Sequence, residues 1–121
     1  MTPRASFAFM SWHIFDSGKS IGLVGSENGV IIRDEEHPDG ARITLERDTD
    51  IAPFAITCGI YGWMFHTRYF GLEPQARAEF DSMSKELSKI TAMIPLETAS
   101  DVHDKSRAVS ESISDFVRRF P

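Results

Sequence analysis

The hydrophobic pattern changes its period once, near Glu73 and Pro74, and this change constrains the fold more than any other feature. Before it, apolar residues alternate with polar ones or form short runs broken by Gly, Pro and Asn, which is typical of strands. After it, apolar residues recur every three or four positions, which is typical of amphipathic helices. Because strands precede helices, the sequence predicts an α+β fold and not an alternating α/β fold. A length of 121 residues suits a single domain, residues 1–121.

The first half of the chain predicts an antiparallel sheet of about five strands. The expected strands cover residues 6–15, 20–25, 30–33, 41–47 and 54–70. The Asn28-Gly29 pair indicates a hairpin turn between the second and third of them. Residues 34–40, which end in Pro38-Asp39-Gly40, are expected to form an exposed polar tip. Residues 54–70 are too long for one ordinary strand, so one bent strand, two short strands and a buried helix all stay open there.

The second half predicts two helices that pack on one face of the sheet. Pro74 suits the first turn of a helix, and Pro95 ends the apolar stripe that follows it. That stripe consists of Ala76, Phe80, Met83, Leu87, Ile90 and Ile94. Residues 98–101 supply candidate caps for the second helix. Its stripe consists of Val102, Val109, Ile113, Phe116 and Phe120.

The charge balance argues against two classes of partner. The formal net charge is −5, and the acid excess is spread over both halves of the chain. Nucleic acids and anionic membrane surfaces both attract basic proteins, so we expect neither as a partner. The longest uncharged run, residues 51–67, contains Pro53 and two glycines, which favours buried strand over a membrane span.

Targeting and cofactor signals are weak. The apolar N-terminal run lacks a small-x-small cleavage pattern, so the sequence favours a cytoplasmic protein. Cys58 is the only cysteine, and its apolar surroundings predict an inert core thiol. Gly18-Lys19-Ser20 looks like the end of a phosphate loop, but His13 stands where that motif needs glycine and a strand-like segment follows. We therefore expect no bound cofactor.

One cluster contains the residue types that bind hard cations. Four carboxylates and one imidazole fall within six positions, and oxygen ligands are what calcium or magnesium requires. The candidate metal ligands are Asp34, Glu35, Glu36, His37 and Asp39. Their order does not match a calcium loop, and a charged tip also keeps an exposed hairpin in solution.

A second candidate site lies near the end of the expected sheet. His66 and Arg68 share one face of a strand, where an imidazole and a guanidinium can bind a small anion, with Trp63 nearby. The alternative is that both side chains are solvated or paired within the structure.

The sequence favours a non-enzymatic interaction module that binds a protein partner or a second copy of itself. Trp12, Tyr61 and Tyr69 are the candidate interface residues, because these side-chain types are enriched at interfaces. The alternative function is an enzyme or a small-anion or metabolite-binding protein with its site at His66 and Arg68. No complete catalytic motif is present in the sequence.

Overall fold

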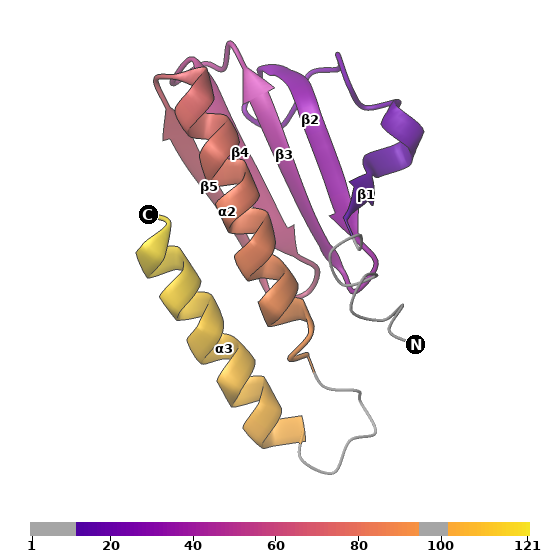
Figure 1. Cartoon of the computed structure of the whole chain (residues 1–121), viewed down its shortest axis with the longest axis vertical. Helices are drawn as coiled ribbons and strands as arrows, with labels where there is room; N and C mark the ends of the chain where they lie inside the picture. The colour runs from indigo at the N-terminus through magenta and orange to yellow at the C-terminus, as the bar shows by residue number, and fades with distance from the viewer. Residues whose placement is uncertain (1–11, 95–101) are drawn as a thin grey trace.

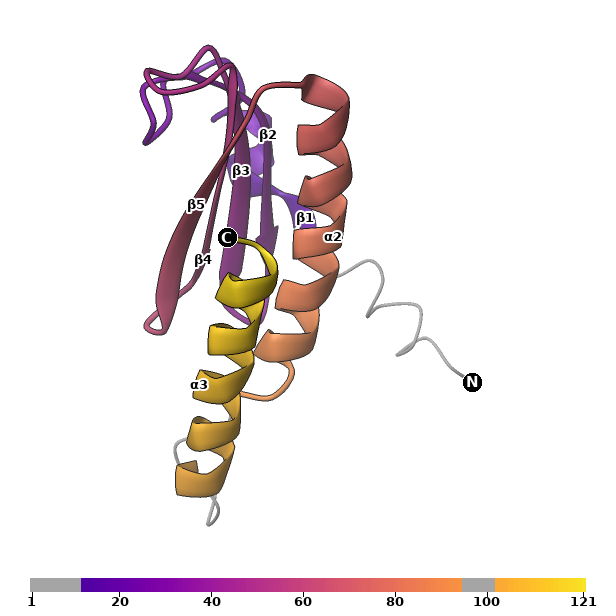
Figure 2. The same ribbon diagram turned by 90° about the vertical axis from the view of Figure 1, so that its left-hand side faces the viewer.

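The computed structural model describes residues 12–94 and 102–121, with side chains from residue 104 in the second range. It consists of one antiparallel sheet with two helices on one side (Figures 1 and 2), which confirms the predicted α+β fold. The strands follow one another across the sheet in chain order as β1 (His13–Ile14), β2 (Val30–His37), β3 (Ala41–Arg47), β4 (Phe54–Ile60) and β5 (Met64–Phe70). A short 3-10 turn, η1 (Phe15–Gly18), follows β1.

The pairing register divides the sheet into a covered and an uncovered face. Ile43 lies opposite Cys58, and Leu45 lies opposite Ile56, so these apolar side chains point to the same side. That side packs against the helices and holds the core. On the other side, no helix of the described residues covers the sheet (Figure 2), and this side carries Thr44, Thr57 and the residues in register with them. We call it the open face.

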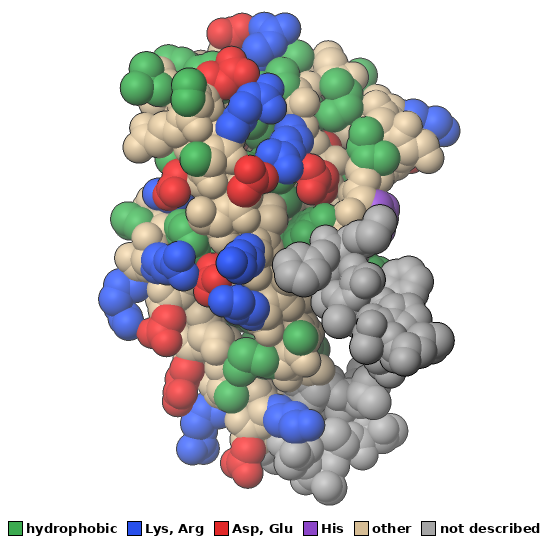
Figure 3. Space-filling model, in the orientation of Figure 1, with side chains coloured by type: hydrophobic (Ala, Val, Ile, Leu, Met, Phe, Trp, Pro, Cys, Tyr) green, Lys and Arg blue, Asp and Glu red, His purple; other side chains and the backbone are tan. Residues whose placement is uncertain are grey.

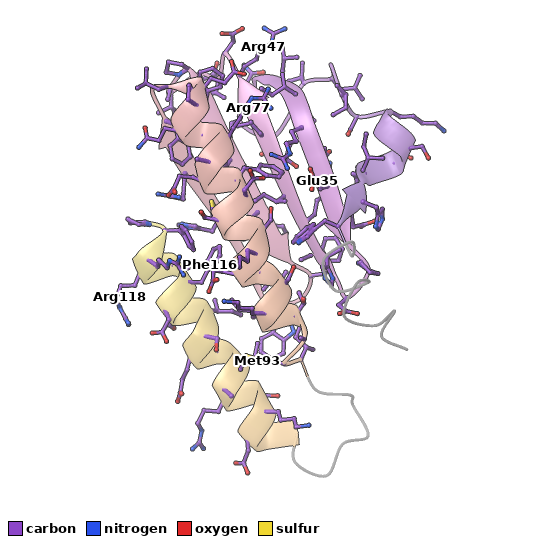
Figure 4. The ribbon with its side chains drawn as sticks, viewed as in Figure 1. Glu35, Arg47, Arg77, Met93, Phe116 and Arg118 are labelled. Carbon is purple, nitrogen blue, oxygen red and sulfur yellow. The ribbon has the colours of Figure 1, made fainter. Side chains whose placement is uncertain are left out.

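The helices begin and end close to the predicted positions. α2 (Glu73–Thr91) has Pro74 in its first turn, and it buries five of the six predicted stripe residues while Ile94 is half-buried beyond its end. α3 (Val102–Arg119) lies beside α2 (Figure 1) and buries Val109 and Phe116. Figure 4 shows Phe116 directed from α3 toward α2 and Arg118 directed away from them. The predicted caps at residues 98–101 lie outside the described residues.

The expected strand at residues 20–25 is wrong. This segment is a loop that meets β2 through a single bridge between Val24 and Val30. Gly22 has a φ of 89°, which turns the chain where a strand would stay extended. The loop keeps hydrogen bonds to β2, because Gly22 N–H donates to Ile31 O and Ile31 N–H donates to Leu23 O.

The expected polar tip is wrong for most of its length. β2 extends through His37, and only residues 38–40 form the turn to β3. The physical reason is pairing: Asp34 and Glu36 lie opposite Thr44 and Arg42, so their polar side chains have partners on a strand. The pattern of apolar and polar residues within 30–37 does not predict which residues of β3 lie opposite them.

Two expected strands remain to be compared with the structure, at residues 54–70 and at residues 6–15. Residues 54–70 form two strands joined by a turn with Gly62 at φ 82°, so a single bent strand and a buried helix are both wrong there. Of the strand expected at residues 6–15, the structure shows His13–Ile14 as β1, while residues 6–11 lie outside the described part. In that described part, no helix is long and apolar enough to cross a membrane.

Candidate functional site

A groove of about 500 Å3 lies on the open face of the sheet. Its floor is formed by Ile31, Thr44, Thr57 and Gly59, side chains and backbone of three neighbouring strands. Its walls belong to three other segments: the loop at Val24, Gly25 and Ser26, the turn at Tyr61, and the edge strand at Phe65. We call this feature the open-face groove.

The open face is recessed at the groove because small residues lie directly opposite one another on neighbouring strands. Thr44 lies opposite Thr57, which lies opposite Thr67, and Arg42 lies opposite Gly59, which lies opposite Phe65. A Cβ atom at Gly59 would lie 2.9 Å from the ring of Phe65, so the ring covers the place where a side chain would stand. Phe65 nevertheless remains 82% exposed, which leaves a large apolar surface at the rim.

An ion pair between half-buried Arg42 and buried Asp34 organises one end of the groove. Arg42 Nε donates to Asp34 Oδ1 at 2.9 Å and Nη2 donates to Oδ2 at 2.6 Å. Ser20 Oγ and Thr44 Oγ1 donate to the same carboxylate at 2.8 and 3.1 Å. The hydrogen bond to Asp34 is the main cause that raises the pKa of Arg42, so its guanidinium stays charged. It lies 3.6 Å from the ring centre of Phe15.

A second buried carboxylate holds the loop against the sheet. Glu46 is wholly buried, and its Oε1 accepts hydrogen bonds from the backbone N–H groups of Gly29 at 3.0 Å and Glu27 at 3.2 Å. A Cβ atom at Gly25 would lie 2.4 Å from Cδ of Glu46, so only glycine allows this approach. The loop therefore covers one end of the open face, which Figure 2 shows on the side opposite α2.

Hydroxyl groups complete the rim. Ser26 Oγ lies 3.4 Å from Thr57 Oγ1, which lies 3.3 Å from Thr67 Oγ1. Tyr69 donates its hydroxyl hydrogen to Glu27, and Tyr61 donates to Glu36 at 2.7 Å. Burial, followed by the hydrogen bond to Glu36, raises the pKa of Tyr61 to about 12, so its hydroxyl stays neutral near neutral pH.

His66 and Arg68 share the helix-covered face of β5, as the sequence predicted. Their polar atoms meet the end of the chain: His66 Nε2 contacts the main-chain oxygen of Phe120, and Arg68 Nε donates to Pro121 O at 3.2 Å. Arg68 Nη1 also donates to Glu79 at 2.8 Å, and its side chain is only 12% exposed. Trp63 lies in the turn before β5 and packs against the core. These contacts match the alternative in which the pair is satisfied within the structure.

The candidate metal ligands divide between the two faces of the sheet. In β2, Asp34 and Glu36 point to the open face, while Glu35 and His37 lie on the helix side. Asp39 follows in the turn, where its N–H donates to His37 Nδ1 at 3.1 Å. Within residues 12–94 and 102–121, no three His, Cys, Asp or Glu side chains lie close enough to hold a metal ion.

The candidate interface residues also lie on different sides of the sheet. Tyr61 and Tyr69 are exposed beside the open face, at 47% and 39%. Trp12 lies on the helix side, where its Nε1 donates to Ser88 Oγ at 2.7 Å. Among the described residues that Figure 3 shows on this side, basic and acidic side chains are mixed with scattered apolar ones, and Figure 4 shows Glu35 on β2.

Cys58 is buried on the covered face, opposite His66 across the ladder. Burial raises the pKa of its thiol to about 12, which leaves too little thiolate for nucleophilic chemistry. The core-thiol prediction therefore agrees with its environment.

Sequence reasoning missed the residues that form the groove. The alternation of residues 41–47 predicted that Arg42 and Thr44 face water, and Gly59 was interpreted as a bulge, a bend or a reversal of the chain. The available signal was the presence of two aromatic residues, Phe65 and Tyr69, on the strand face that they share with Thr67. No protein-family model, curated protein or solved structure matches this chain.

Proposed function

We propose that this domain is a non-enzymatic interaction module that receives a protein partner in the open-face groove. The observation that carries this proposal is an exposed apolar rim around a groove on the one face that no helix covers. Phe65 is 82% exposed and Val24 is 69% exposed, and they stand on different walls of the same groove. Apolar side chains gathered in this way are typical of binding surfaces.

The groove favours a segment of a partner protein over an enclosed small molecule. It is open to solvent at its rim, where the side chains of Phe65 and Val24 are exposed. Small-molecule sites usually surround most of their ligand, whereas protein interfaces combine a central apolar contact with a polar rim. Here hydroxyl groups and two tyrosines form that rim.

The charges near the groove favour a basic segment. Arg42 is neutralised by Asp34, whereas the carboxylates of Glu36 and Glu27 lie beside the groove, with His13 Nε2 3.7 Å from Glu36. A partner that places an apolar side chain in the groove and Lys or Arg beside it would match this arrangement. An anionic ligand would meet these carboxylates, and the cation at Arg68 is already paired with Glu79.

The test compares wild-type protein with a variant whose groove is filled. Thr57→Trp places a bulky ring on the floor, and Lys85→Trp places the same ring on the exposed surface of α2 as a matched control. Proteins captured from the source organism are compared quantitatively, and one retained by the control but lost with the filled groove is purified. We then expect direct binding by calorimetry that weakens at least about tenfold in Thr57→Trp, which corresponds to about 1.4 kcal/mol.

Two results contradict the proposal. One is that every captured protein binds the filled and control variants equally well. The other is a metabolite-sized mass that stays bound in native mass spectrometry and disappears in Thr57→Trp. If that variant does not fold, Val24→Lys at the exposed rim replaces it.

A further inference from the structure

We propose that β5 is a self-association edge, where two copies of this chain join antiparallel into one continuous sheet. This goes beyond the proposed function, because it concerns the sheet edge and a second copy instead of the groove and its partner. It would place two open-face grooves side by side on a double-width sheet.

β5 is the long edge of the sheet. Among the described residues its backbone ladder is with β4 alone, and that pairing is regular over seven residues. The opposite edge, β1, has two residues. Figure 2 looks toward the β5 side, where α3 lies on the helix side of the sheet and the end of the chain contacts β5 at His66 and Arg68. A long edge therefore has unpaired N–H and C=O groups that can accept another strand.

β5 lacks the features that usually protect an edge. It contains no Pro, Lys or bulge. Its one permanently charged side chain, Arg68, points to the helix side and is paired with Glu79. Phe65 and Tyr69 instead extend from the other side, and both are exposed. Such an edge is well suited to pair with another strand.

The sequence of β5 is complementary to itself when two copies pair about Thr67. A twofold axis perpendicular to the sheet keeps each face on its own side, so directly opposite residues must belong to the same face. Centring on Thr67 uses all seven residues and places Phe65 opposite Tyr69 of the second copy, twice. Aromatic cross-strand pairs of this kind stabilise antiparallel pairing. It also places His66 opposite Arg68, so no two permanent charges of one sign face each other.

The interface would be small. Two paired edge strands and four aromatic rings bury less than the roughly 1,200 Å2 of a standard stable interface. We therefore expect a dimer that dissociates on dilution, with monomers at micromolar and dimers at near-millimolar protein concentration. Sedimentation equilibrium over this dilution range measures the association directly.

A cysteine placed at residue 67 tests the register. In the proposed dimer, Thr67→Cys faces its own copy, within the distance a disulfide can bridge, and mild oxidation should join two chains. Phe65→Cys is the matched control, because its two copies would stand about 14 Å apart at about 3.4 Å per residue. The native Cys58 is buried and should remain reduced in both variants.

A charge at the same position tests the pairing without cross-linking. Thr67→Lys sets two ammonium groups opposite each other and should weaken the dimer at least about tenfold. Ile51→Lys, at a 71% exposed position in the loop after β3, should leave the dimer unchanged. If Thr67→Lys does not fold, Phe65→Lys replaces it, because that side chain is already in water.

The outcomes separate clearly. A concentration-dependent dimer that cross-links through residue 67 and not residue 65 supports the proposal. A protein that stays monomeric at every concentration overturns it. A dimer that cross-links equally at both positions, or not at residue 67, overturns it as well, because its interface lies elsewhere.

Discussion

The guanidinium of Arg42 is held by the buried carboxylate of Asp34 through two hydrogen bonds of 2.6 and 2.9 Å. The pair joins β3 to β2, and Ser20 from the preceding loop donates to the same carboxylate. Residues from three segments thus depend on one acidic side chain. Because Ser20 and Arg42 are far apart in sequence, no local pattern predicted that they bind the same carboxylate.

Replacing Asp34 should destabilise the fold strongly. Asp34→Ala leaves Arg42 without its counter-ion, and breaking a buried pair from one side costs roughly 3–5 kcal/mol. We expect the lower end of that range, because the Arg42 side chain is 34% exposed and water can reach it. Urea unfolding monitored by tryptophan fluorescence measures the free energy of unfolding.

The matched control is the ion pair between Arg47 and Asp48. It has the same 2.6 Å contact, but its side chains are 49% and 72% exposed. Surface pairs contribute about 0–1 kcal/mol, so Asp48→Asn, which removes the charge but suits the φ of 56° at this position, should change stability little. Equal losses for the two variants would mean that Asp34 is not the buried anchor described above.

Gly25 should tolerate no side chain. Gly25→Ala drives a methyl group to 2.4 Å from Cδ of Glu46, so the loop or the carboxylate must move away from its amide partners. We expect a loss of about 1–3 kcal/mol, the usual cost of overpacking. Amide exchange at Glu27 and Gly29 should also become faster, because their N–H groups lose the acceptor.

Gly71→Ala provides the comparison. A Cβ atom at Gly71 would meet nothing within 4 Å, and its φ is not in the left-handed region. The substitution should be neutral, or stabilising by about 0.4–1 kcal/mol, because it restricts the unfolded chain. If Gly25→Ala proved as mild as Gly71→Ala, the close contact with Glu46 would be disproved.

The two predictions above concern features that periodicity does not encode. Apolar spacing predicted α2 and α3 well, because a helix that packs on a sheet must repeat its apolar stripe. The alternation of residues 41–47 likewise predicted β3. Local pattern failed at residues 20–25, whose apolar side chains belong to a loop folded over the open face, and at residues 34–37, whose charges have partners on β3.

The contacts of the candidate site at His66 and Arg68 were hidden from the sequence for a related reason. His66 and Arg68 were correctly placed on one face, yet their partners, Phe120 and Glu79, come from segments far away in sequence. The open-face groove required the register of β3, β4 and β5 together before its floor could be recognised. A single sequence predicts which residues share a face of one strand. It does not predict which residues of the neighbouring strands lie beside them on that face of the sheet.

The thiol of Cys58 should be unreactive while the protein is folded. Its pKa of about 12 leaves almost no thiolate at pH 8, and the side chain is only about 1% exposed. We expect no labelling by a maleimide or a disulfide reagent in native buffer, and one equivalent in concentrated urea. Rapid stoichiometric labelling of folded protein would contradict the burial of this residue.

His37 should make stability fall in mild acid. Burial is the main cause that lowers its pKa below the usual 6.5, although Asp39 acts in the opposite direction and His13 in the same one. The unfolded chain therefore binds a proton near pH 6.5 before the folded chain does. The stabilisation is complete above pH 6.5 and is lost as the pH falls through the lower folded-state pKa.

The measurement is the free energy of unfolding from pH 8 down to pH 5. In that window His37 should add a decline of no more than about 1.4 kcal/mol per pH unit, the limit for one proton. His37→Asn keeps an acceptor for the N–H of Asp39 but cannot titrate, so its curve should be flatter than the wild-type curve. A His37→Asn curve parallel to wild type would show that other groups cause the acid sensitivity, and that packing against Trp12 does not shift the pKa of this imidazole.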